Sequence, residues 1–144
     1  MKKLSLLCIL ALIAPTFAQE IPATVTINVS NLRNDDGQVV ALLFSSADGF
    51  PMEQDKALHI ETMAIEHGVA IVTFTDLSYG DYALLVIHDE DMNDELNTNF
   101  IGKPTEKCWI SNGQRGGPFG GPEFDASTFE VLTESVVINA RFSD

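Results

Sequence analysis

The densest group of metal-binding residue types in this chain lies between residues 88 and 112. Asp89, Asp91 and Asn93 occupy alternate positions, and Asn97 and Glu106 follow them. Alternating carboxylate and amide oxygens on a short loop are a common way for a polypeptide to wrap a hard cation such as calcium. No cysteine–histidine cluster accompanies these oxygens, which disfavours zinc. We therefore predict a calcium site built from Asp89, Asp91, Asn93, Asn97 and Glu106, with Asn99 as the alternative to Glu106 in completing the shell.

The spacing is not that of an EF-hand. The sixth position of that loop is glycine in the template and Asp94 here, and the twelfth is glutamate in the template and Phe100 here. The alternative to a metal site is a solvated acidic turn whose Asp and Asn side chains cap their own backbone. Asp89 and Asp91 repel each other when no cation lies between them, and this favours the metal interpretation.

An enzyme would draw on a different set of residues. His88 as general base, with Cys108 or Ser111 as nucleophile, would make a small hydrolase. No G-x-S-x-G elbow surrounds any serine. Neighbours in a strand point to opposite faces, so His88 and Asp89 do not pair readily. A structural hydrogen bond is the favoured role for His88, and a buried position beside Trp109 is the favoured role for Cys108. The hydrolase remains an alternative function.

The elements that must position these residues follow a period of two. Strands are expected over residues 23–29, 38–44, 59–65, 69–75, 81–88, 127–132 and 135–142, with one short helical turn within 52–58. The segments 38–44 and 81–88 are apolar on both faces, which is typical of central strands. About seven short strands separated by frequent turns predict an all-β fold, an antiparallel two-sheet β-sandwich.

Residues 1–18 have the pattern of an export signal. Lys2 and Lys3 precede an apolar run over residues 4–13 that is too short to span a bilayer, and small residues end at Ala18. We predict cleavage after Ala18, a single domain over residues 19–144, and a periplasmic or extracellular location. Cys108 is then the one cysteine left, so no internal disulfide is expected.

The chain is strongly acidic. It has 21 Asp and Glu against 8 Lys and Arg, for a formal net charge of −13, and loss of Lys2 and Lys3 with the signal would make this −15. Such a charge repels nucleic acid. No apolar stretch after residue 18 is long enough to span a membrane. A soluble monomer is the expected state, and assembly through an exposed sheet edge, as in an adhesion module, is the alternative.

Aromatic residues border the long loops of the second half. Pro104, Trp109, Phe119 and Phe124 indicate a loop face of the kind that binds carbohydrate or a protein partner. The alternative, which we favour, is that these rings pin the loops to the sandwich. In either case the sequence does not identify a ligand.

Several short motifs stand out together. They are the run from Gly80 through Tyr82 to His88 and Asp89, the Asn-rich acidic loop, and the segments 102–106 and 111–112. In combination they resemble the bacterial DUF2141 family, a domain of unknown function in exported proteins. The family pattern has Asn-Gly where this chain has Asn93 and Asp94. The Gly-x-Tyr turn into a central strand is also similar to that of transthyretin-like and carboxypeptidase-regulatory sandwiches, and the expected sandwich is immunoglobulin-like or transthyretin-like. The resemblance implies export and a sandwich fold, and it implies no activity.

Overall fold

The computed structural model describes residues 21–116 and 120–143, so the predicted export signal lies outside the described part. Within that part, no helix has the length and apolar character needed to cross a membrane. Strands make up most of the regular structure, in the order β1 (Ala23–Ser30), β2 (Gln38–Phe44), β3 (His59–Ala64), β4 (Ala70–Leu77), β5 (Gly80–Asp89), β6 (Cys108–Ile110), β7 (Phe129–Val131) and β8 (Ser135–Arg141). The short helices are η1 (Gln54–Lys56), η2 (Ser111–Gly113) and α1 (Phe124–Ser127).

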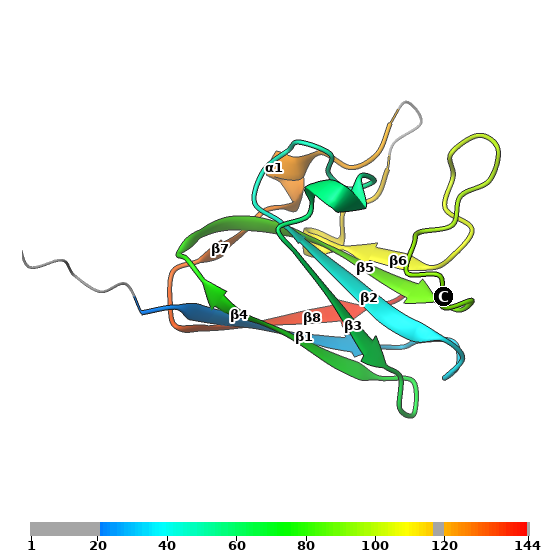
Figure 1. Cartoon of the computed structure of the whole chain (residues 1–144), viewed down its shortest axis with the longest axis horizontal. Helices are drawn as coiled ribbons and strands as arrows, with labels where there is room; N and C mark the ends of the chain where they lie inside the picture. Colours follow the sequence, from blue (N-terminus) through cyan, green and yellow to red (C-terminus); the bar gives the residue numbers. More distant parts are fainter. Residues whose placement is uncertain (1–20, 117–119, 144) are drawn as a thin grey trace, which may run out of the picture.

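The strands form two sheets, which confirms the predicted sandwich (Figure 1). One sheet has the order β4-β1-β8, and the other has the order β3-β2-β5-β6 with β7 paired to β5. One pair departs from the antiparallel expectation, because β1 and β8 run parallel. A parallel neighbour requires a crossover connection, and here β4 and all five strands of the other sheet lie between β1 and β8 in the chain.

Sequence periodicity missed the short elements. The described residues contain eight strands instead of about seven, because β6 is only three residues long and shows no alternation. Residues 124–127 form α1, so the strand expected from residue 127 begins only at Phe129. The helical turn expected within 52–58 is the 3-10 helix η1. The strand β3, exposed along its whole length, is an edge of its sheet; assembly through that edge stays a prediction.

The central strands β2 and β5 of the five-stranded sheet are buried on both faces, which explains why they are mostly apolar. One face packs on the three-stranded sheet and forms the main core, to which β5 contributes Tyr82, Leu84 and Val86. The opposite face carries a second cluster, to which β5 contributes Leu85 and Ile87. The segment with η1, and α1, cover this outer face (Figure 1). By the alternation of a strand, Asp89 falls on the outer face at the end of β5.

Candidate metal centre

The end of β5 places Asp89 in a closed polar corner. Gln38 begins β2 directly opposite Asp89 in the antiparallel ladder, so both side chains lie on the outer face. The Gln38 Nε2 group donates to Asp89 Oδ2 at 2.8 Å and to Asp94 Oδ1 at 2.7 Å. Asp89 is fully buried, with 0% of its surface exposed. A carboxylate so buried needs hydrogen bonds or a cation to offset its lost hydration.

Three carboxylates meet here, those of Asp89, Asp91 and Glu106, and we call this group the acidic corner. Asp89, Asp91 and Glu106 each offer an oxygen, and the three oxygens all lie within 4.8 Å of one another. Glu106 comes from the far end of the β5–β6 loop, seventeen residues after Asp89, so the fold closes the loop upon itself. The structure thus brings together three of the five predicted ligands, and their binding of a metal stays a prediction. Their donors are hard oxygens, which suit calcium or magnesium.

Backbone N–H groups fix the orientation of these carboxylates. Asp89 Oδ1 accepts from the N–H of Asn93 at 3.2 Å, and its Oδ2 accepts from the N–H of Asp94 at 2.9 Å. Glu106 Oε1 accepts from the N–H of Glu90 at 3.2 Å, and its Oε2 accepts from the N–H of Asn97 at 3.0 Å. These hydrogen bonds orient the carboxylates. Asp89 Oδ1 and both oxygens of Glu106 each keep a lone pair for a metal, whereas Asp89 Oδ2 accepts from both Asp94 and Gln38.

The two asparagines surround Asp91 and present nitrogen to it. Asn93 Nδ2 donates to Asp91 Oδ2 at 3.2 Å, and Asn97 Nδ2 donates to the same oxygen at 2.8 Å. Asn93 Oδ1 accepts from the N–H of Glu95, and Asn97 Oδ1 accepts from Asn93 Nδ2. Rotation of either amide by half a turn would place an oxygen where a nitrogen now lies. The role of Asn93 and Asn97 as metal ligands stays a prediction.

The backbone of the loop takes left-handed conformations at two residues that are not glycine. Asp94 has φ of 63° and Met92 has φ of 59°. Aspartate tolerates this region better than most residues, because its short side chain bonds locally. The Asp94 carboxylate accepts a hydrogen bond from Gln38, and this contact helps to offset the conformational cost. A tight turn at Asp94 therefore forms without glycine.

No basic side chain neutralises the three carboxylates in the described part of the chain. The single ion pair there joins Lys56 to Asp48 at 3.2 Å, away from the acidic corner. Burial would raise the pKa of Asp89, but hydrogen bonds from Gln38 and from the N–H groups of Asp94 and Asn93 outweigh it and hold that pKa below its ordinary value. Asp89 is ionised at neutral pH. Like charges within 4.8 Å repel by at least about 1 kcal/mol per pair, so a cation would relieve the site.

Two residues that contact Asp89 escaped the sequence analysis. Gln38 is recognised as a partner only once the register of β2 and β5 is known. Gly37, with φ of +73°, passes so close to the end of β5 that a Cβ atom on it would overlap the Asp89 carbonyl oxygen. No local sequence pattern shows the contact that makes this glycine necessary, because it depends on how the turn packs against β5.

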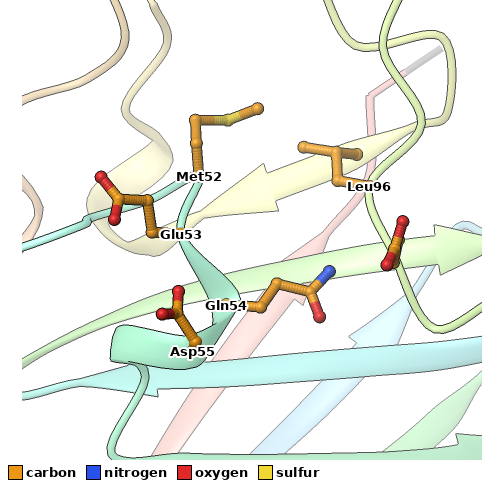
Figure 2. A pocket seen from close by; sticks show the side chains of 6 residues that line it. Met52, Glu53, Gln54, Asp55 and Leu96 are labelled. Atoms are coloured by element: carbon orange, nitrogen blue, oxygen red, sulfur yellow. The ribbon is translucent and has the colours of Figure 1, made fainter.

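A shallow groove adjoins the acidic corner. Its volume is about 420 Å³, and it separates the segment around η1 from the start of the Asn-rich loop. Figure 2 shows Met52 and Leu96 extending toward each other across it, while Gln54 reaches toward the loop. The polar part of the lining comes from Glu53, Asp55 and Glu95, so the groove extends the negative surface of the metal centre.

The residues of the alternative hydrolase do not gather in one site. His88 is 1% exposed and its Nε2 lies 2.9 Å from the Asp36 carbonyl oxygen, which is the structural role predicted for it. Cys108 packs with the cluster on the outer face of the sheet, whereas His88, next to Asp89, faces inward. Ser111 bonds to the backbone of Leu84, about 13 Å along β5 from His88. Burial also raises the pKa of the Cys108 thiol, which makes it a poor nucleophile at neutral pH.

Ser111 instead joins two segments of the core. Its buried hydroxyl donates to the carbonyl of Ser127 and accepts from the N–H of Leu84. We expect Ser111→Ala to lower the free energy of unfolding by about 1–3 kcal/mol, because both partners lose a buried hydrogen bond. Urea denaturation measures this loss. The exposed Ser46 supplies the control, and a Ser111→Ala protein as stable as Ser46→Ala would contradict the structural role.

The aromatic residues of the loops mostly serve packing. Trp109 packs against the main core, and Phe124 packs against the outer cluster. Phe124 also contacts Phe50 edge to face, with ring centroids 5.6 Å apart. Phe119 lies outside the described residues. The described rings thus pin the loops to the sandwich, and binding of carbohydrate or protein to this face stays a prediction.

Comparison with known proteins gives one result. Neither curated proteins nor solved structures include a match to this chain. A family model described as "Uncharacterized protein conserved in bacteria (DUF2141)" matches residues 27–139. That span begins within β1 and ends within β8, and it contains Gly37, Gln38 and every residue of the acidic corner. The chain therefore belongs to the DUF2141 family.

Proposed function

We propose that this protein is an exported, non-catalytic binding module whose acidic corner holds one calcium ion. The observation that carries the proposal is the convergence of Asp89, Asp91 and Glu106 within 4.8 Å with no basic partner among the described residues. Asp89 and Asp91 would neutralise the ion, and Glu106 would close the loop over it. Asn93, Asn97 and water would complete a shell of about 6–8 oxygens.

Calcium is preferred to magnesium because of how the donors are arranged. Magnesium demands a near-ideal octahedron and keeps most of its water, whereas calcium accepts irregular shells built from loops. The donors here come from the end of a strand and from both ends of one loop. In the proposed function the ion orders residues 89–106, and the loop then serves as the surface for a protein or carbohydrate partner.

Thermal unfolding with calcium and with chelator tests the proposal. Calcium at about a hundredfold excess over its dissociation constant stabilises the folded state by about 2.7 kcal/mol, which raises Tm by roughly 5–15 °C for a domain of this size. We expect Asp91→Asn to remove this increase. Asp81→Asn, an exposed acid at the other end of β5, should retain it. An unchanged Tm at millimolar calcium would reject the metal claim.

A further inference from the structure

The tip of the β5–β6 loop presents two large apolar side chains to solvent. We call residues 97–105 the arm, and Figure 1 shows it projecting beyond the sheets. Phe100 is 98% exposed and Ile101 is 71% exposed, the two highest values among the large apolar side chains of the described residues. Exposure of an adjacent pair costs solubility, so a paired apolar tip indicates an interaction site.

The arm is built to hold this tip in place. The N–H of Asn99 donates to the Lys103 carbonyl at 2.9 Å, and the N–H of Gly102 donates to the Asn99 carbonyl at 2.9 Å. Asn99 Oδ1 accepts from the N–H groups of Ile101 and Lys103. The side chain of Asn99 therefore caps the turn that carries the tip and lies away from the metal centre. None of these contacts involves Asp89, Asp91 or Glu106.

The arm itself carries no acidic side chain. Residues 97–105 contain no Asp or Glu and one Lys, in a chain with 21 acids. Lys103 follows the apolar pair by two positions, so its ammonium group can reach a phosphate while its stem lies along apolar surface. A lipid headgroup at the tip would therefore meet no carboxylate from residues 97–105.

We propose that the arm inserts Phe100 and Ile101 into the surface of a lipid bilayer. The shape of the tip favours lipid over protein. A stable protein interface needs about 800 Å² per partner and some 20–30 residues a side. A narrow convex turn offers only two large apolar residues, Phe100 and Ile101. A bilayer accepts a convex apolar wedge, and aromatic rings settle at its interface. Zwitterionic lipid suits the arm best, since anionic lipid would repel the acids of the sandwich.

Flotation of the purified protein with phosphatidylcholine–phosphatidylethanolamine vesicles tests the insertion. We expect the partition coefficient of Phe100→Ser/Ile101→Ser to be at least tenfold below that of the wild type. The matched control is Ile71→Ser/Val137→Ser, because Ile71 and Val137 are both 59% exposed on the three-stranded sheet; it should partition like the wild type. All variants share the same N-terminus, so any contribution from residues 1–18 cancels.

A second measurement does not depend on loss of binding. Phe100→Trp should shift its emission to the blue on addition of vesicles and should be quenched by brominated lipid, unlike the native Trp109. Both experiments are run with calcium and with chelator. The tip should bind vesicles in both conditions, so a failure of calcium binding is distinguishable from a failure of lipid binding. A partition coefficient of Phe100→Ser/Ile101→Ser equal to that of the wild type would overturn the proposal. Self-association lost in Phe100→Ser/Ile101→Ser, without vesicle binding, would also overturn it and would assign the tip to protein contacts.

Discussion

Gly37→Ala is expected to be the most damaging single substitution near the metal centre. An added Cβ would overlap the Asp89 carbonyl oxygen and would lie 2.7 Å from the Glu90 Cα atom, and both are backbone atoms that cannot rotate away. The left-handed φ of Gly37 adds a further cost for alanine. We expect a loss of about 3 kcal/mol or more in the free energy of unfolding, measured by urea denaturation.

Gly113→Ala is the control that separates these two costs. Gly113 has a similar φ of +65°, but no atom lies within 4 Å of the point that an added Cβ would occupy. It should lose only about 1 kcal/mol, the cost of the backbone conformation alone. Equal losses at the two glycines would show that β5 does not pack on Gly37 as described, and the position of Asp89 would then be in doubt.

Asp89→Ala should destabilise the protein even when no metal is present. The substitution leaves Gln38 and the N–H groups of Asn93 and Asp94 without their buried acceptor. Removing one partner from a buried charged hydrogen-bond group costs about 2–4 kcal/mol. Asp91→Ala, at an exposed position of the same loop, should cost less than about 1 kcal/mol in chelator.

Comparison of Asp89→Ala with Asp91→Ala distinguishes a structural carboxylate from a carboxylate that serves only as a metal ligand. In chelator only Asp89→Ala should lower the urea midpoint by a large amount. With calcium, both variants should fail to gain the stability that the wild type gains. If Asp89→Ala is as stable as Asp91→Ala in chelator, the hydrogen bonds to Asp89 do not hold the loop, and its burial needs another explanation.

The sandwich could be predicted because its signal is local. Strict alternation in β1 and β8, and apolar runs in β2 and β5, reflect burial on one face or on both faces. The boundaries of β2 were predicted without error for the same reason. The parallel pairing of β1 with β8 could not be predicted, because alternation fixes which face a residue takes and does not fix its neighbour strand.

The candidate site was only partly predictable. Asp89, Asp91 and Glu106 stand out because of their residue types and because a loop can return to its base. The roles of Gln38 and Gly37 depend on the register between β2 and β5, a contact between segments some fifty residues apart. The orientation of Asn93 and Asn97 depends on the whole hydrogen-bond network around Asp91. Such three-dimensional contacts leave no periodic pattern in the sequence.

Calorimetric titration of calcium into the chelator-stripped protein tests the central claim most directly. We expect one site per chain, with binding removed in Asp91→Asn/Glu106→Gln and retained in Asp81→Asn. Magnesium should bind more weakly than calcium. Absence of heat and of any saturable site at millimolar calcium, with the protein folded, would contradict the metal claim and leave the three carboxylates as an acidic turn held by its own hydrogen bonds.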